Sequence, residues 1–517
     1  MKPLIHLLLV ALFTAVGNSL AGSKPNIIVF LADDLGYADV GVYGCRDIPT
    51  PHIDALARNG VRFTDGYANH PICSPSRAGL LSGVYQHRFG FENNSGPEEY
   101  SARNFGVPRD VPMLAERLKG AGYATCMVGK WHVGFQPGLR PHERGFDHSY
   151  IFLSGARTFY PVGERQNNQL YRNGAAFNDE TEYLTDAFAR DSVRFIDQHR
   201  KSKRGEDPFF LFFSFNAVHL PLEATEAYES RFPKITDPAR KTYAGMLSAL
   251  DDAIGRVMNR LRELDMEEET LVFFYSDNGG PTHQTTSRND PLRGLKGQMF
   301  EGGIRIPFVI QWPGKIAAGS TYRNPVMGFD VHATALAAAE IKLPERQRID
   351  GQDLLPFLNG ENSTKPHDQL FWRAGKEHAA RVGDWKLVET RAGEKFLFHL
   401  AEDIGETTNL AAKKPEKLRE LNAAFSSWSD QMETPRWIRQ DRSNAEVGGK
   451  LKKTSTRKRK KTLKSIFTKA DKNGDSKLSN SEFWAKETFR AVDANADGFV
   501  TIEELRAYYA KRRSDSR

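Results

Sequence analysis

The amino-acid sequence predicts an α/β protein in which a parallel sheet is covered by helices on both faces. Over most of the chain, short continuous apolar runs alternate with segments of helical periodicity. From about residue 367 the pattern changes to short alternating stretches, and one loop motif occurs twice near the end. We therefore expect a smaller antiparallel subdomain and a short α-helical tail after the α/β core. The chain has 517 residues, 39% of them hydrophobic, which is enough for a sizeable core.

The first residues of the chain are typical of a secretory signal peptide. Lys2 precedes an apolar run over residues 4–16, and Ser19 and Ala21 are small residues suited to a cleavage site. The run is too short to span a bilayer, and no later stretch is apolar for about 18 residues. We therefore expect an exported protein, periplasmic or secreted, with no membrane anchor.

The cysteine count excludes a disulfide scaffold. Only Cys45, Cys73 and Cys126 are present, which is too few to stabilise an exported chain of this size. If Cys73 serves another purpose, Cys45 and Cys126 either pair with each other or remain two separate buried thiols. The sequence leaves both alternatives open.

The formal net charge of +7 arises from one segment. Nine lysines and arginines and no acidic residue lie in residues 450–464, and the remainder of the chain is close to neutral. This basic run has no interleaved aromatic residues and the chain carries an export signal. Nucleic acid is therefore not an expected partner.

Four apolar runs are predicted to be central strands, each with polar residues at its carboxyl end. The runs are residues 26–31, 123–128, 209–215 and 271–275, and helical segments over 111–119, 184–199 and 243–264 lie between them. The polar residues that follow the runs are Asp33 and Asp34, Lys130 and His132, His219, and Asp277 and Asn278. Ligands of such sheets bind beyond the carboxyl ends of the strands, so we expect these residues to share one crevice.

A helix that starts at Cys73 is predicted to enter the same crevice. Pro75 fits its first turn, Ala78, Leu80 and Leu81 form an apolar stripe, and Gly83 ends it. Cys73 then lies at the positive end of the helix dipole, with Arg77 one turn further on. Such a position attracts anions.

The polar residues at two of the strand ends indicate a metal site. Asp33 and Asp34 repel each other at a buried strand end unless a cation neutralises them. Asp277 and Asn278 add two further oxygen ligands. An all-oxygen set of this kind suits Ca²⁺ or Mg²⁺ rather than Zn²⁺.

The tail contains two loops that match the EF-hand motif, which binds Ca²⁺ through side-chain and backbone oxygens. The expected ligands are Asp471, Asn473, Asp475, Lys477 and Glu482 in the first loop, and Asp493, Asn495, Asp497, Phe499 and Glu504 in the second. Ser476 replaces the usual glycine at the sixth position, so we expect the first loop to bind Ca²⁺ more weakly. The loops lie close together, with one shared helix around residues 483–492.

These features divide the chain into five expected segments: a signal peptide over 1–21, a catalytic core over 22–365, an antiparallel subdomain over 366–440, a basic linker over 441–461 and an EF-hand pair over 462–517.

Several motifs, in order, resemble those of the sulfatase family over roughly residues 24–410. They are Asp33-Asp34-Leu35-Gly36, Cys73-Ser74-Pro75-Ser76-Arg77 with Gly83, Gly129-Lys130-Trp131-His132, His219, Asp277-Asn278-Gly279-Gly280, residues 291–297 and residues 301–303. The resemblance implies an alkaline-phosphatase-like α/β/α sandwich with a smaller carboxyl-terminal subdomain. It also implies that a maturation enzyme oxidises Cys73 to formylglycine.

The resemblance assigns a role to each candidate residue. One Ca²⁺ is held by Asp33, Asp34, Asp277, Asn278 and the modified Cys73, and the formylglycine hydrate attacks the sulfur of a sulfate ester. The other catalytic residues are Arg77, which holds the hydrate, Lys130 and Lys296, which offset charge on the sulfate, His132, which assists proton transfer, and His219, which with Lys296 protonates the departing oxygen.

The substrate expected from the resemblance is a sulfated glycan or an aryl sulfate. Ser154 lies where some relatives place a sulfate-contacting serine, and His87, Arg88, Arg157, His283 and Arg288 are candidates for contacts with other anionic groups or are solvated surface residues. Two other functions remain open. One is phosphodiester or phosphonate monoester hydrolysis on the same core, and the other is non-catalytic, calcium-dependent polysaccharide binding.

Overall fold

The computed structural model describes residues 24–96, 104–161, 169–347, 349–437, 467, 470–473, 475–483 and 489–514. The chain forms two compact units, residues 1–439 and 440–517, which are described separately. The expected signal peptide and basic linker lie outside the described residues, and the five segment boundaries stay predictions. Among the described residues, no helix combines the length and apolar character needed to cross a membrane.

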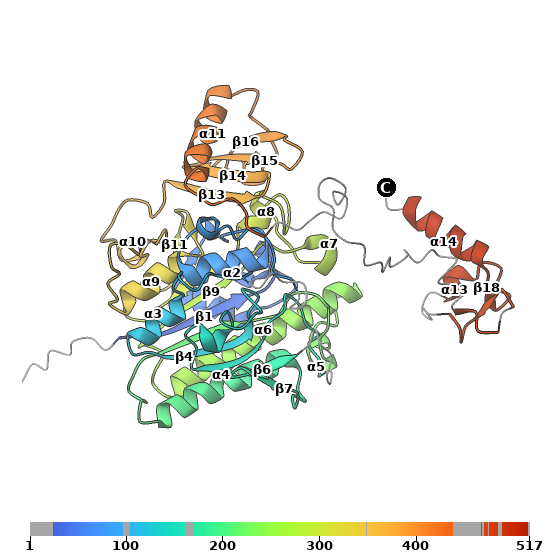
Figure 1. The fold of residues 1–517 in the computed structure, drawn as a ribbon, viewed down its shortest axis with the longest axis horizontal. Coiled ribbons are helices and arrows are strands. Elements are labelled where there is room, and N and C mark those ends of the chain that lie inside the picture. The colour runs from blue at the N-terminus through green and yellow to red at the C-terminus, as the bar shows by residue number, and fades with distance from the viewer. Residues whose placement is uncertain are drawn as a thin grey trace, which may run out of the picture. The chain divides into compact units, whose positions relative to one another are not determined.

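A ten-stranded mixed sheet forms the centre of the larger unit (Figure 1), with the strand order β11-β2-β10-β9-β1-β8-β4-β5-β6-β7. Its middle strands are the four predicted ones: β9 (Thr270–Ser276), β1 (Asn26–Ala32), β8 (Phe209–Ser214) and β4 (Ala124–Lys130). They are parallel, with Val29 beside Phe212 and Phe273. The predicted fold class is confirmed.

The edges of the sheet are less regular than predicted. On one side β10 (Phe308–Gln311) and β2 (Val61–Phe63) run antiparallel to their inner neighbours, and β11 (Ser320–Tyr322) pairs with β2 in parallel. On the other side β5 (His148–Phe152) is parallel to β4, and the hairpin β6 (Leu170–Arg172) and β7 (Ala175–Phe177) is antiparallel. A separate pair, β3 (Gly66–Tyr67) and β12 (Val326–Met327), lies outside this sheet.

Helices cover both faces of the sheet (Figure 1). One face carries α4 (Leu184–Lys201) and α6 (Pro238–Glu263), and the other carries α2 (Cys73–Ser82), α3 (Leu114–Gly120) and α9 (Asp330–Ala338). Side chains alternate along the strands and so form two cores. Phe30 and Leu211 pack with α6, whereas Val29 and Phe212 pack with α2 and α3.

The helix boundaries follow local chemistry. Helix α6 begins at Pro238, five residues before the predicted start, because the side chain of Asp237 accepts a hydrogen bond from Arg240 N at 2.6 Å and caps the helix. Helix α2 begins at Cys73 as predicted and ends at Gly83, whose φ of 73° suits glycine. The shorter helices are α1 (Pro51–Arg58), α5 (Glu226–Glu229), α7 (Thr282–Thr285), α8 (Glu301–Ile304) and α10 (Leu355–Leu358), with 3₁₀ turns at Tyr37–Asp39, Gly41–Tyr43, Gln86–Phe89 and Pro141–Glu143.

The antiparallel subdomain is present as predicted. Its four-stranded meander consists of β13 (Gln369–Ala374), β14 (Glu377–Val382), β15 (Trp385–Glu389) and β16 (Lys395–His399). Helix α11 (Pro415–Ser429) packs on it, mainly against β14. A fully buried ion pair joins Lys386 of β15 to Glu301 of α8 at 2.7 Å, so the subdomain is attached to the loop that carries Lys296.

The smaller unit contains two loops joined by a short β-bridge. Strand β17 (Leu478–Ser479) pairs antiparallel with β18 (Phe499–Val500), and α13 (Phe489–Val492) and α14 (Ile502–Ser514) complete the described part. Phe467, Leu478, Val500 and Leu505 are among its buried residues. Of the helix expected around residues 483–492, residues 484–488 lie outside the described residues, and residues 489–492 form α13.

All three cysteines are free thiols. Cys126 lies on β4 inside the core, and Cys45 is half-buried beside Asp47, at 3.3 Å from its Oδ1. Of the two alternatives left by the sequence, the structure therefore has separate thiols.

Candidate active site

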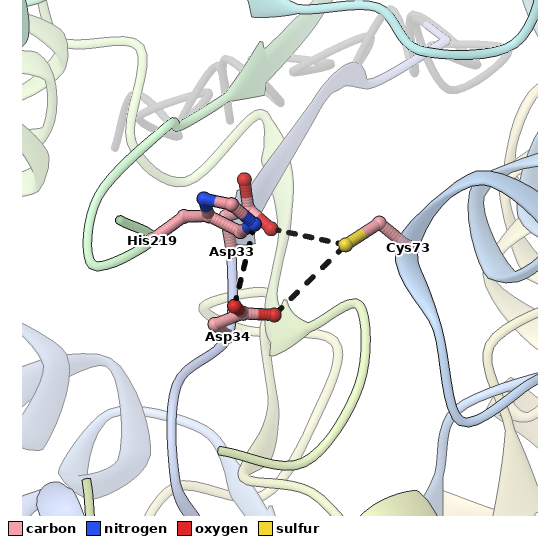
Figure 2. A group of neighbouring side chains, drawn as sticks. All are labelled: Asp33, Asp34, Cys73 and His219. Carbon is pink, nitrogen blue, oxygen red and sulfur yellow. Dashed lines mark hydrogen bonds and ion pairs between the residues drawn. The ribbon is translucent and has the colours of Figure 1, made fainter. Parts of the chain in front are cut away.

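The polar residues that follow the central strands converge at the start of α2 (Figure 2). Cys73 Sγ lies 3.5 Å from Asp33 Oδ1 and 3.9 Å from Asp34 Oδ1, both at the carboxyl end of β1. His219, from the segment after β8, places Nε2 3.5 Å from Asp34 Oδ2. The residues that the sequence predicted to meet at this edge of the sheet thus lie together.

Each buried aspartate of the crevice is paired with a cationic side chain. Lys130 Nζ is 2.6 Å from Asp33 Oδ2, and both side chains are inaccessible to solvent. Arg77 Nε donates to Asp277 Oδ2 at 2.8 Å, which ties α2 to the end of β9. Three fixed positive charges, counting Lys296, therefore surround the Cys73 side chain and favour an anionic ligand.

Lys296 links the second aspartate to the cysteine. Its Nζ lies 2.6 Å from Asp34 Oδ1 and 3.2 Å from Cys73 Sγ. Burial opposes the charged ammonium, but the carboxylate of Asp34 and the neighbouring Cys73 hold the pKa of Lys296 well above its usual value. The side chain therefore carries its full positive charge beside the Cys73 position.

The charges shift the pKa values of the two other aspartates in opposite directions. Burial disfavours ionised Asp33, but the positive charges of Lys130, His219 and Arg77 outweigh it and hold the pKa of Asp33 well below its usual value. Burial and the charge of Asp33 raise the pKa of Asp277 in spite of its bond to Arg77. Asp277 is therefore the carboxylate of the three whose ionised form a further positive charge would stabilise most.

The thiol encoded at position 73 is a poor nucleophile. Cys73 is 1% exposed, and burial and the charge of Asp277 raise the pKa of its thiol to about 12 in spite of Lys130. A thiol with this pKa is almost fully protonated at neutral pH, and the thiolate is the reactive form. Although Cys73 lies at the start of helix α2, its sulfur is therefore not activated as a nucleophile.

The donor set fits a hard cation. Ligand atoms of Asp33, Asp34, Cys73 and His219 all lie within 4.8 Å of one another. The amide of Asn278 donates from Nδ2 to Asp34 Oδ1 at 2.7 Å, while its buried Oδ1 has no hydrogen-bond partner among the described residues. A buried amide oxygen without a donor is costly, and a bound cation would satisfy it. The residues of the predicted metal site therefore lie together and present mainly oxygen ligands.

The two histidines of the crevice differ in environment. His132 is 4% exposed, and burial and the charges of Lys130 and Arg77 hold its pKa well below the usual value, so it is neutral. Its Nε2 lies 3.2 Å from the carbonyl oxygen of Ser95. The side chain of His219 is 18% exposed, with Nδ1 2.7 Å from the carbonyl oxygen of Leu220. His219 therefore lies nearer the opening of the crevice.

The sequence did not identify the residues that hold these groups in place. Ser214 Oγ contacts Arg77 Nη1 and donates to the carbonyl oxygen of Lys130 at 2.7 Å. Ser74 Oγ contacts the carbonyl oxygen of His132, to which Ser95 Oγ donates at 3.0 Å. Serines carry no distinctive signal in a single sequence, and only the fold brings them together.

Four residues considered for substrate contacts are bound to other residues of this chain. His87 Nε2 lies 2.9 Å from the carbonyl oxygen of Arg373, and Arg88 makes two 2.6 Å contacts with Asp350. Arg288 pairs with Asp47 at 3.4 Å. Ser154 Oγ donates to the carbonyl oxygen of Ala156 at 2.8 Å.

Both predicted EF-hand loops have the turn that the motif requires. In the first, Asp471 Oδ2 accepts from Ser476 N at 2.9 Å, and in the second Asp493 Oδ2 accepts from Gly498 N at 3.1 Å. Ser476 has a φ of 65°, close to the left-handed conformation that Gly498 adopts at 85°. The serine therefore forms the same turn as the glycine, at a conformational cost.

Fold and site together define a hydrolase of the alkaline-phosphatase type, in which an anionic ester binds among fixed cations at the carboxyl edge of a parallel sheet. Comparison with protein families makes the class specific. The sulfatase family model matches residues 25–341, and the model for the carboxyl-terminal part of N-sulphoglucosamine sulphohydrolase matches residues 295–427. An EF-hand model matches residues 485–507. The chain belongs to the sulfatase family and is a sulfuric ester hydrolase.

Individual relatives agree with this assignment. The chain is 34% identical to N-acetylgalactosamine-6-sulfatase of Sus scrofa over 469 residues, covering 80% of this chain and 87% of that one. Among solved structures, Ps i-CgsB in complex with k-i-k-neocarrahexaose is 35% identical, with a TM-score of 0.76, over 80% of this chain and 95% of that chain. PsFucS1 sulfatase from Pseudoalteromonas sp. is 26% identical, with a TM-score of 0.69, over 79% and 90% of the two chains.

Proposed function

We propose that this enzyme removes sulfate from a sulfated carbohydrate through a formylglycine that is made from Cys73, with one Ca²⁺ held by Asp33, Asp34, Asp277 and Asn278. The observation that carries the proposal is the position of Cys73. Its sulfur lies within 3.2–3.9 Å of Lys296, Asp33 and Asp34, at a helix start buried among cationic side chains. These surroundings suit an anionic sulfate group whose electrophilic sulfur lies next to residue 73.

The cationic side chains would bind the ester and offset its charge. The ammonium groups of Lys130 and Lys296 are each fixed by an aspartate at 2.6 Å, and that of Lys296 lies 3.2 Å from Cys73 Sγ. A fixed charge in a site that excludes water stabilises the transition state more than a mobile one, because no reorganisation is needed. Lys130, Lys296 and Arg77 therefore supply the electrostatic part of the catalysis.

The two histidines would move the protons. His219, near the opening, is suited to protonate the departing alcohol oxygen together with Lys296. His132 is buried and neutral, and its Nδ1 has no hydrogen-bond partner among the described residues. It is therefore able to accept a proton from a hydroxyl at residue 73, and Arg77 holds that hydroxyl in place.

Two groups complete the chemistry. A formylglycine at position 73 would supply, as its hydrate, one hydroxyl that attacks sulfur and a second whose deprotonation releases sulfate. A calcium ion would supply positive charge to the oxygens of the sulfate and of the hydrate. The neutral, protonated thiol of the encoded cysteine supports the need for such a conversion, because it offers no competent nucleophile.

The relatives favour a carbohydrate substrate. One is named for N-acetylgalactosamine-6-sulfate hydrolysis, and a structural neighbour is complexed with k-i-k-neocarrahexaose. Both exceed 30% identity with this chain over most of its length. We infer that a sulfated sugar, of a polysaccharide or an oligosaccharide, is the substrate, that a formylglycine-generating enzyme is the maturation partner, and that the enzyme is exported.

The test uses protein from a host with the maturation machinery. Sulfate release is measured on a panel of sulfated oligosaccharides that includes N-acetylgalactosamine 6-sulfate, together with matched aryl sulfate and aryl phosphate esters. We expect release from at least one sugar and a preference for the aryl sulfate over the phosphate. A faster reaction on the phosphate would assign the site to phosphoryl transfer instead.

The two tail loops are proposed as further Ca²⁺ sites. Asp471, Asn473, Asp475 and Glu482 in the first, and Asp493, Asn495, Asp497 and Glu504 in the second, supply side-chain oxygens, with backbone oxygens from Lys477 and Phe499. Calorimetric titration with Ca²⁺ is expected to give tail sites in addition to the active-site ion.

A further inference from the structure

The side chain of one buried asparagine has no hydrogen-bond partner among the described residues. Asn216 is 2% exposed, and neither its Nδ2 nor its Oδ1 makes a hydrogen bond with any described residue. A carboxamide has two donors and two acceptor lone pairs, and leaving them unmet in a protein interior is costly. A buried amide without partners requires an explanation, and one explanation is a ligand that supplies the missing hydrogen bonds.

The position of Asn216 along the chain places it at the reaction crevice. It follows β8 and precedes His219, whose backbone N–H donates to Asn216 O at 2.9 Å. The next two residues pair with the metal-site strand, since Asp33 N donates to Ala217 O at 3.0 Å and Val218 N donates to Asp33 O at 2.9 Å. Asn216 therefore lies directly beside Asp33.

The neighbours of Asn216 show which way its side chain faces. Phe213, Phe215 and Ala217 all belong to the core on the α4 and α6 side of the sheet. Ser214 points the other way and contacts Arg77. Strand β8 ends at Ser214, but Phe215 N still donates to Leu31 O and Ala217 O still accepts from Asp33 N, so the pairing with β1 continues past Asn216. Side chains alternate along such a pairing, and Asn216, between Phe215 and Ala217, therefore faces the same side as Ser214. That side holds Arg77, on helix α2, which begins at Cys73.

We propose that Asn216 is an additional substrate-contacting residue whose Nδ2 donates a hydrogen bond to an oxygen of the sulfate group. This inference rests on the proposed function, because it takes a sulfate ester as the ligand of the crevice. Asn216 adds a neutral donor to a site whose other sulfate contacts are cations, and so it binds the anion without further charge. The N–H groups of the carboxamide then have a hydrogen-bond acceptor only when the ester or the sulfate product is bound.

The test is calorimetric binding of inorganic sulfate, the reaction product, to the calcium-loaded enzyme and to two variants. Asn216→Leu keeps the approximate shape and removes the donor, and we expect sulfate affinity to fall about tenfold or more, since hydrogen bonds to charged groups have this strength. Its thermal midpoint should stay equal or rise, because an unpartnered buried amide is removed. Asn216→Asp, which is isosteric but anionic, should bind sulfate still more weakly.

A matched control removes an unpartnered polar group elsewhere in the sheet. Ser149 of β5 is 1% exposed and its Oγ also has no partner among the described residues. Ser149→Ala should leave sulfate affinity unchanged. Native sulfate affinity in both Asn216 variants would overturn the inference, as would a loss of turnover on a sugar sulfate with unchanged affinity for inorganic sulfate. If Asn216→Leu fails to fold, Asn216→Asp decides the question alone.

Failure of this inference is separable from failure of the proposed function. Turnover of sulfate esters by the native enzyme tests the function and involves no variant. Native enzyme that releases sulfate, combined with Asn216 variants of native sulfate affinity, would leave the function standing and reject the role of Asn216. Absence of any turnover by the native, fully matured enzyme would reject the function first.

Discussion

Replacing Lys296 by methionine tests whether its ammonium stabilises charge on the departing oxygen. Lys296 Nζ lies 3.2 Å from the sulfur of Cys73, so the leaving oxygen of an ester bound there falls within about 5 Å of the ammonium. At that distance and an effective dielectric constant of about 20, a full charge on the oxygen is stabilised by about 3 kcal/mol. This corresponds to a rate factor of about one hundred.

The effect should depend on the leaving group. A sugar alkoxide develops most of a full charge, so Lys296→Met should lower kcat on a sugar sulfate about one hundredfold. A nitrophenolate delocalises its charge and needs little protonation, so the loss on the aryl sulfate should be only about tenfold. The assay is steady-state kinetics on a series of esters with graded leaving-group pKa, at equal calcium content of the two proteins.

Lys130→Met is the matched control. Lys130 is paired to Asp33 at 2.6 Å as Lys296 is paired to Asp34, but its side chain is inaccessible to solvent. It should act on the sulfate group alone, and its removal should slow all esters by a similar factor. Equal losses on all esters for Lys296→Met as well would refute the leaving-group argument and leave sulfate binding as its role.

Three further outcomes are expected. Cys126→Ala should lower the unfolding free energy by about 1 kcal/mol through a small cavity in the core and leave turnover unchanged, as measured by denaturant titration and kinetics. Burial raises the pKa of Asp251 to about 7, with added repulsion from Asp252. Because the folded protein holds this proton more tightly than the unfolded chain, whose pKa is about 4, the protonated carboxyl stabilises the fold fully below about pH 4. This contribution to stability is lost as the pH rises through about 7. At pH 5 the thermal midpoint of Asp251→Asn should therefore equal that of the native protein. At pH 8 the midpoint of the variant should be higher, and equal midpoints at pH 8 would contradict the assignment. A chain that ends at residue 439 should keep its turnover of a small aryl sulfate and bind fewer Ca²⁺ ions by calorimetry, and an unchanged number of ions would refute the EF-hand assignment.

The central strands were predictable because their sequences are unambiguous. Residues 209–213 are apolar throughout and lie fully buried between two layers of helices, as a continuous run requires. Strands near the edges of the sheet, such as β10 and β2, have only three or four residues. A pattern this short cannot be distinguished from that of a loop. The mixed character of the sheet follows from these edges and was missed for that reason.

The site was predictable where its residues have a distinctive chemistry at a strand end. Asp33, Asp34 and Asp277 fall into this group, because adjacent or buried carboxylates require partners. The sequence could not identify the partner of Arg88, because Asp350 lies 262 residues away and only the fold brings the two together. Asn216 was missed because an asparagine after an apolar run is ordinary, and its significance lies in the absence of partners around it.

Peptide mass spectrometry across Ile72–Arg77, combined with sulfate release on the same samples, tests the central claim most directly. Enzyme is prepared in hosts with and without the maturation machinery, so that the fraction of converted Cys73 varies between samples. Turnover should rise in proportion to the fraction of formylglycine at position 73 and should be absent from Cys73→Ala at an unchanged thermal midpoint. Full turnover by protein that carries only the unmodified thiol would contradict the account.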